Sequence, residues 1–159
     1  MRVVAGDPRD AQATALLRQS HALMQELFEP EENYFFDIEE LCFPSIRFLA
    51  AKDGQTITGT AALSLKEGYA EVKSMFVDPD RRGEGIADAL MEGLEQTARD
   101  EGVTLLKLET AEKLAAAVKL YARHGFTQCG IFGDYRPNDT SYFMEKLLYP
   151  ETAPGASSK

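Results

Sequence analysis

Two arginines and two glycines just before a helical pattern are the clearest chemical feature of the sequence. Arg81, Arg82, Gly83 and Gly85 lie together, and apolar residues recur at helical spacing from Ile86 onward. The start of a helix leaves backbone N–H groups unpaired and carries a partial positive charge, and glycines let a ligand approach this backbone closely. The pattern therefore predicts a phosphate-binding loop; the alternative is a solvated turn whose arginines face water.

The spacing of these residues excludes two common phosphate loops. A dinucleotide-binding fingerprint would need a glycine or alanine three residues after Gly85, and the sequence has Asp88 there. A P-loop would need Gly-Lys-Ser/Thr, which the sequence lacks.

A strand and a long helix must position this loop. Glu71–Val77 mixes β-branched and aromatic residues in imperfect alternation, which suits a strand covered on both faces. Asp78-Pro79-Asp80 ends the strand, because proline cannot donate to a sheet ladder. The helix runs from Ile86, with Gly102 as its C-terminal cap.

A hexapeptide within this segment matches a known pattern. Arg82-Gly83-Glu84-Gly85-Ile86-Ala87 fits Arg/Gln-x-x-Gly-x-Gly/Ala and follows a strand that ends in Met75-Phe76-Val77. The segment resembles the acetyl-CoA signature of the GNAT N-acetyltransferase superfamily. The resemblance implies that amides from Gly83 to Ala87 hold the pyrophosphate of acetyl-CoA, the co-substrate, and that the backbone of Met75 and Val77 pairs with its pantetheine arm. On this basis we expect the cofactor-binding residues to be Met75, Phe76, Val77, Arg81, Arg82, Gly83, Glu84, Gly85, Ile86 and Ala87.

Tyr121 is the expected general acid. It lies in Leu120-Tyr121-Ala122-Arg123-His124-Gly125-Phe126, which resembles the family's Leu-Tyr-x-x-x-Gly-Phe. In many members this tyrosine protonates the coenzyme sulfur, and a phenol suits that role because it stays protonated at neutral pH. The alternative is a core tyrosine whose hydroxyl merely finds a partner. Leu114 departs from the family, which commonly has asparagine there, so one usual hydrogen bond to the pantetheine region is absent.

Two glutamates compete for the role of general base. Glu71 begins the central strand and resembles the base of histone-type GNAT enzymes, whereas Glu109 matches in position the glutamate of ribosomal-protein alanine acetyltransferases. Either would take the proton of the amine through water, and a partly buried glutamate with a raised pKa suits that task. Lys73, on the same strand face as Glu71, either pairs with it or binds a substrate carboxylate.

The resemblance also implies a fold: a mixed α/β (α+β) domain with a central, mostly antiparallel twisted sheet, splayed at the acetyl-CoA site. We expect six to seven strands, flanked by about four helices, in a single domain over residues 1–149, followed by a disordered tail over 150–159. The expected strands are Arg2–Ala5, Ser45–Lys52, Gln55–Lys66, Glu71–Val77, Thr104–Glu109, Phe126–Phe132 and Ser141–Leu147. The expected helices run from Asp7-Pro8 to Phe28, within Glu31–Pro44, from Ile86 to Gly102, and over Ala111–His124.

Composition narrows the class of partner and the compartment. The formal net charge of −9 argues against nucleic acid and is compatible with a cationic amine, although acidity also serves solubility. No apolar run approaches the roughly 20 residues of a membrane span. Two cysteines and two histidines form no disulfide framework or visible metal site, which favours a cytoplasmic protein.

These observations predict an N-acetyltransferase that moves acetyl from acetyl-CoA to a primary amine of a small molecule, by direct attack in a ternary complex. Peptide N-termini and protein lysines are alternative acceptors, and a non-catalytic CoA-binding sensor is the competing class. The acceptor pocket is expected from the loops Glu31–Pro44 and Gly133–Thr140, which do not name the acceptor. Homodimers are common in the family, so the resemblance allows one here.

Overall fold

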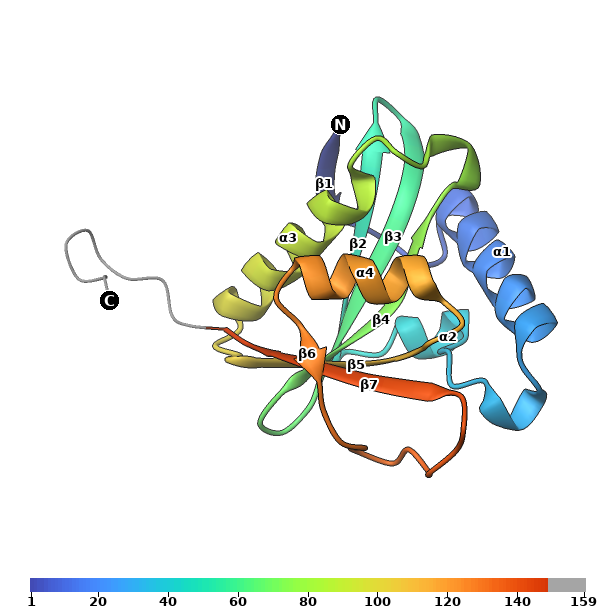
Figure 1. The fold of residues 1–159 in the computed structure, drawn as a ribbon. Helices are drawn as coiled ribbons and strands as arrows, with labels where there is room; N and C mark the ends of the chain where they lie inside the picture. The colour runs from blue at the N-terminus through green and yellow to red at the C-terminus, as the bar shows by residue number, and fades with distance from the viewer. Residues whose placement is uncertain (149–159) are drawn as a thin grey trace.

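Seven strands form one twisted sheet in the order β1-β2-β3-β4-β5-β7-β6 in the computed structural model, which describes residues 1–148 (Figure 1). The strands are β1 (Arg2–Ala5), β2 (Ile46–Asp53), β3 (Thr56–Leu65), β4 (Ala70–Val77), β5 (Leu105–Ala111), β6 (Thr127–Gln128) and β7 (Ser141–Leu147). Only the β4–β5 pair is parallel among these strands. The predicted mostly antiparallel sheet is confirmed, and the predicted tail lies outside the described residues.

Helices cover both faces of this sheet, and each face has its own core. The α-helices within the described residues are α1 (Ala11–Leu27), α2 (Ile38–Leu41), α3 (Ile86–Asp100) and α4 (Ala115–Arg123), with short 3-10 helices η1 (Pro30–Glu32) and η2 (Pro79–Arg81). On one face Leu90 of α3 packs in a cluster with Leu63 of β3. On the other face Leu17 of α1 shares a cluster with Ala62, the neighbour of Leu63. Successive side chains of β3 therefore serve opposite cores, as the alternation of a strand requires.

Two helices begin later than the sequence predicts. The predicted start of α1 at Asp7-Pro8 is wrong, because Asp10 is the N-cap and its carboxylate accepts from the N–H groups of Gln12 and Ala13. The predicted start of α4 at Ala111 is also wrong, because Ala111 still pairs with Ser141 at the end of β5.

The predicted strand Phe126–Phe132 is mostly absent. Only Thr127 and Gln128 form β6, opposite Glu145 and Met144 of β7. One further hydrogen bond joins Cys129 N–H to the Phe143 carbonyl at 2.8 Å. The chain beyond it belongs to the β6–β7 connection, which lies at the same end of the sheet as the β3–β4 turn (Figure 1).

The central pair of strands comes apart along its length. β4 and β5 pair only at Ala70↔Leu106 and Glu71↔Lys107, after which no further pairing joins them. An irregularity in the β3–β4 register opposite Ser74, whose φ is 56°, adds local bending to β4. The remainder of β4 therefore presents backbone groups toward an opening beside β5, as the predicted splay requires.

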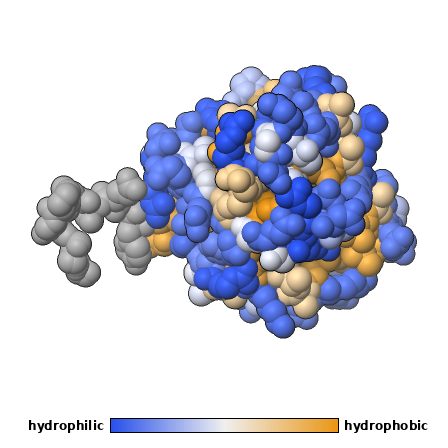
Figure 2. All heavy atoms as spheres, turned by 90° about the horizontal axis from the view of Figure 1, so that it is seen from above, coloured by the Kyte–Doolittle hydropathy of each residue, from blue (hydrophilic) through white to orange (hydrophobic). Residues whose placement is uncertain are grey.

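The surface is largely polar around these cores. The face shown in Figure 2 is mostly hydrophilic, with small hydrophobic patches between charged and polar residues. Within residues 1–148, no helix has the length and apolar character needed to cross a bilayer.

Gly59 lets α3 pack close to β3, because it has no side chain at the point of contact. A Cβ at this position would lie 3.0 Å from side-chain carbons of Ile86 and Leu90 and 3.1 Å from the Phe76 carbonyl oxygen. We expect Gly59→Ala to lower the free energy of unfolding by about 1–3 kcal/mol, because the added methyl overpacks this contact. Gly130→Ala is the matched control, since a Cβ there meets nothing within 4 Å. Equal denaturant unfolding curves for the two variants would contradict this account.

Candidate active site

The connection from β4 to α3 forms a cradle of backbone amides. Gly83 and Gly85 have φ values of 85° and 82°, which L-residues with side chains rarely adopt. Gly85 is the N-cap of α3, and no side chain caps this helix. The N–H groups of its first turn are therefore available to an anion, where the partial positive charge of the helix favours negative charge.

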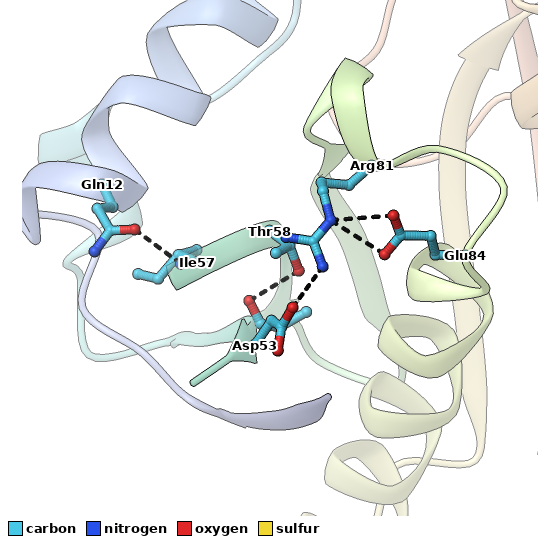
Figure 3. Close-up of polar contacts among 7 residues, drawn as sticks. Gln12, Asp53, Ile57, Thr58, Arg81 and Glu84 are labelled. Carbon is cyan, nitrogen blue, oxygen red and sulfur yellow. Dashed lines mark hydrogen bonds and ion pairs between the residues drawn. The ribbon is translucent and has the colours of Figure 1, made fainter. Parts of the chain in front are cut away.

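Arg81 braces this cradle from outside (Figure 3). Its Nη2 donates to Asp53 Oδ2 at 2.7 Å, and its Nε lies 3.1 Å from both carboxylate oxygens of Glu84. The hydrogen bond from Arg81 lowers the pKa of Asp53. Arg81 thus ties the β2–β3 turn to the loop, while the exposed Arg82 places its guanidinium 5.7 Å from the Phe76 ring centroid. Their predicted contacts with the coenzyme stay predictions.

Where β4 and β5 diverge, a cavity of about 150 Å³ opens, which we call the inner cavity. β4 supplies Met75, β5 supplies Glu109, and α4 and its N-cap supply Tyr121 and Leu114 to its wall. α1 and the α1–β2 connection supply the opposite wall. The structure therefore brings three groups singled out in the sequence, the backbone of β4, Glu109 and Tyr121, to one opening.

Tyr121 is almost fully buried in this wall, at 7% exposure. Burial, and secondarily the charge of Glu109, raises the pKa of its phenol. The hydroxyl consequently stays protonated and can act as a proton donor.

Glu109 lines the same cavity from the end of β5. Its Oε2 accepts a hydrogen bond of 2.7 Å from Ser141 Oγ on β7. Burial raises the pKa of Glu109, and the Ser141 hydrogen bond and the charge of Lys73 oppose this shift without cancelling it. A carboxylate in this position is more basic than one in water.

The environment of Glu71 differs from that of Glu109, because Glu71 lies beside Lys73 on β4. Its Oε2 accepts a hydrogen bond from the Tyr135 hydroxyl and lies 3.8 Å from Lys73 Nζ. Lys73 Nζ in turn donates to the Tyr34 carbonyl at 2.8 Å and to the Tyr135 hydroxyl at 3.1 Å. Burial lowers the pKa of Lys73, and the charge of Glu71 opposes this effect. Of the two predicted roles of Lys73, the structure shows the pairing with Glu71.

Glu71 is not among the residues that line the inner cavity. It lines a second, larger cavity of about 420 Å³, here called the outer cavity, together with Tyr69, Asp134 and Tyr135. The two candidate bases therefore face different spaces.

Sequence reasoning missed Tyr135 and the place of His21. The sequence gives one indication of Tyr135, which is that a tyrosine lies in a loop otherwise rich in Gly, Pro, Asn and Asp. His21 lines the inner cavity and stacks on Phe35 with ring centroids 4.2 Å apart. Its Nε2 is buried and has no hydrogen-bond partner among the described residues, and burial lowers its pKa.

Two other residues with potentially reactive side chains lie away from this site. His124 Nε2 lies 2.7 Å from Asp88 Oδ1, so it links the end of α4 to the first turn of α3. Cys129 lies outside the residues that line the inner cavity, and burial raises the pKa of its thiol, which disfavours the nucleophilic thiolate.

Comparisons with known proteins agree with this geometry. The model of the Acetyltransferase (GNAT) family matches residues 15–126. The "IAA acetyltransferase" of Azospirillum brasilense is 39% identical over 135 residues, which are 84% of this chain and 88% of that protein. A crystal structure from Klebsiella pneumoniae, provisionally described as an acyl-CoA N-acyltransferase, has 31% identity and a TM-score of 0.77 and covers 92% of this chain and 97% of its own.

A more distant structure shares the fold and contains the coenzyme. PaiA N-acetyltransferase from Thermoplasma acidophilum, crystallised with coenzyme A, is 16% identical with a TM-score of 0.70 and covers 92% of this chain and 98% of its own. The family match spans most of the chain, and the relatives are named acetyltransferases. This chain therefore belongs to the Acetyltransferase (GNAT) family and is an acyltransferase.

Proposed function

We propose that this protein transfers acetyl from acetyl-CoA to a primary amine of a small molecule, by direct attack in a ternary complex. The observation that carries the proposal is that Glu109 and Tyr121 line one cavity where β4 leaves β5. The uncapped start of α3 supports binding of acetyl-CoA by its pyrophosphate, because free amides and two glycines with positive φ suit an anion.

Glu109 is the base in this proposal. Its carboxylate takes the proton of the amine through water, and the amine nitrogen then attacks the thioester carbonyl carbon. Glu71 is less suited, because its Oε2 is already held by the Tyr135 hydroxyl and lies beside the Lys73 ammonium. Glu71 also lines the outer cavity and is absent from the wall that Glu109 shares with Tyr121.

Tyr121 completes the reaction as the acid. As the carbon–sulfur bond breaks, its hydroxyl gives a proton to the departing thiolate, and the phenolate regains a proton from the amine side or from solvent. The products are the amide and the free thiol of coenzyme A. Burial raises the pKa of the Tyr121 phenol, so the group stays neutral, which supports this step.

The size of the inner cavity supports a small acceptor. A space of about 150 Å³ is comparable with an engineered cavity of about 150 Å³ that holds one benzene molecule. Structural neighbours under 25% identical are named for acceptors as different as aminoglycosides and ribosomal-protein alanine, so the fold alone does not choose the acceptor.

The acceptor class is tested by measuring thiol release and product mass over a panel of small primary amines, amino acids, a peptide N-terminus and a lysine peptide. We expect amides of small amines to form faster than those of the two peptides. Turnover with peptides alone would contradict the small-molecule proposal, and tight binding of acetyl-CoA without any turnover would contradict the reaction.

Glu109→Gln should lower kcat/KM by about 10²- to 10⁴-fold, because the amide cannot accept the proton. In the native enzyme only the carboxylate form is active, so the rate should fall as the pH drops through the raised pKa of Glu109. This acid limb should be missing from the residual activity of the variant. Glu112→Gln, an exposed glutamate near the end of the same strand, is the control and should keep the native profile. A native pH profile for Glu109→Gln would exclude the role.

Tyr121→Phe should lower kcat by about 10²-fold or more while leaving the affinity for coenzyme A unchanged, because it removes only the hydroxyl. Tyr142→Phe, on β7, serves as the matched control for loss of a tyrosine hydroxyl. Steady-state kinetics and calorimetry with coenzyme A check both variants. An unchanged kcat at every pH would remove Tyr121 from the mechanism.

A further inference from the structure

The outer cavity lies between three connections at one end of the sheet. The α1–β2 connection supplies Tyr34 and Phe36, the β3–β4 turn supplies Tyr69, and the β6–β7 connection supplies Tyr135. Its volume of about 420 Å³ falls in the range of about 300–1,000 Å³ that is typical of small-molecule sites. Tyr34 and Lys73 line both cavities, so the outer and inner cavities adjoin.

A buried lysine holds the walls of the outer cavity in place. Lys73 is 8% exposed, and its ammonium bonds to one group from each of two connections, the Tyr34 carbonyl at 2.8 Å and the Tyr135 hydroxyl at 3.1 Å. The Phe36 ring centroid lies 4.7 Å from the same nitrogen. The Tyr34 and Tyr135 rings meet edge to face at 4.8 Å. These contacts form the cavity in advance of any ligand.

Glu71 leaves one hydrogen-bond acceptor open to this cavity. It is 5% exposed, and Tyr135 and Lys73 both approach Oε2. Among residues 1–148, no hydrogen bond reaches Oε1. Glu71 Oε1 is not among the buried side-chain atoms that lack a partner, so it is accessible and can accept an N–H or O–H donor from a ligand.

The charges of the lining oppose an anionic ligand. The positive charge of Lys73 is balanced by the negative charge of Glu71. At the exposed rim, the one positive charge of Lys66 is outnumbered by the negative charges of Glu67 and Asp134. A dication such as a polyamine is also disfavoured, because the Lys73 ammonium stands where the two cavities meet. Four aromatic side chains instead suit a flat ring, which packs well edge to face or offset against them.

We propose that the outer cavity binds the non-reacting part of the acceptor, an aromatic ring whose N–H or O–H group donates to Glu71, while a short linker carries the amine into the inner cavity. This inference rests on the proposed acetyl transfer. The protein is thus specific for arylalkylamines that carry a ring donor.

Three amines of similar size test the ring and its donor: 4-(2-aminoethyl)phenol, 2-phenylethylamine and 2-cyclohexylethylamine. We expect kcat/KM to fall in that order, with the phenol preferred to the unsubstituted ring by about tenfold or more, because a hydrogen bond to a charged acceptor is lost. Equal kcat/KM values for the three amines, or a preference for the cyclohexyl compound, would overturn the inference.

Tyr69→Leu tests the aromatic wall without touching the Lys73 contacts. Tyr69 lines the outer cavity and is absent from the inner one, so KM for acetyl-CoA should stay native while the preference for phenyl over cyclohexyl falls several-fold. Phe43→Leu, an aromatic residue 56% exposed and outside both linings, is the matched control and should keep the preference. Identical selectivity for both variants would refute the role of this wall.

A binding measurement separates this inference from the proposed reaction. 4-Ethylphenol has the ring and the donor but no amine, so calorimetry with the native protein should detect its binding, and Tyr69→Leu should weaken it. Binding of 4-ethylphenol without acetylation of any amine would support the cavity and refute the reaction. Acetylation of amines without binding of 4-ethylphenol or ring selectivity would refute the cavity and leave the reaction standing.

Discussion

The divergence of β4 from β5 is the constraint on which the rest of the structure depends. Parallel strands normally pair along their length, because buried backbone groups need partners. Here the pairing stops after Glu71 and Lys107. The backbone of β4 is left facing an opening whose walls are Glu109 and Tyr121. In the proposed reaction, a coenzyme arm that runs along this edge would supply the missing partners of the β4 backbone.

A second constraint is the burial of charge at the other end of β4. Placing Lys73 and Glu71 at 8% and 5% exposure is unfavourable unless both are paired and hydrogen-bonded. Tyr135 and the Tyr34 carbonyl provide those bonds, and both come from connections rather than from the sheet. The burial of two charges thus fixes the course of two loops that otherwise have little regular structure. In the proposed reaction, Glu109 is then the carboxylate that acts beside Tyr121.

The sequence was sufficient for features that rest on local chemistry. Alternation and helical spacing placed β4 and α3, and Gly83 and Gly85 marked the cradle because their backbone conformations demand glycine. The predicted ends of elements are wrong where pairing with a strand distant in the sequence sets them. Ala111 stays in β5 because Ser141 lies opposite, and only two residues of the predicted strand Phe126–Phe132 form β6. The contact of Arg81 with the coenzyme stays a prediction, and the sequence did not indicate that one of its two carboxylate partners is Asp53, 28 positions away. A pattern within one segment cannot predict an ion pair with a residue of another segment.

The same limit explains why the two glutamates could be separated only in three dimensions. Glu71 and Glu109 are both acids near the central strands, and motif position alone supported either as the base. What distinguishes them is contact with residues far along the chain, Tyr135 for Glu71 and Ser141 for Glu109. The Tyr135 contact places Glu71 in a charged cluster with Lys73 beside the outer cavity. The Ser141 contact holds Glu109 in the wall of the inner cavity, which Tyr121 also lines. The two glutamates therefore differ in environment because of residues near the C-terminal end of the fold: Tyr135 lies in the β6–β7 connection, and Ser141 is the first residue of β7.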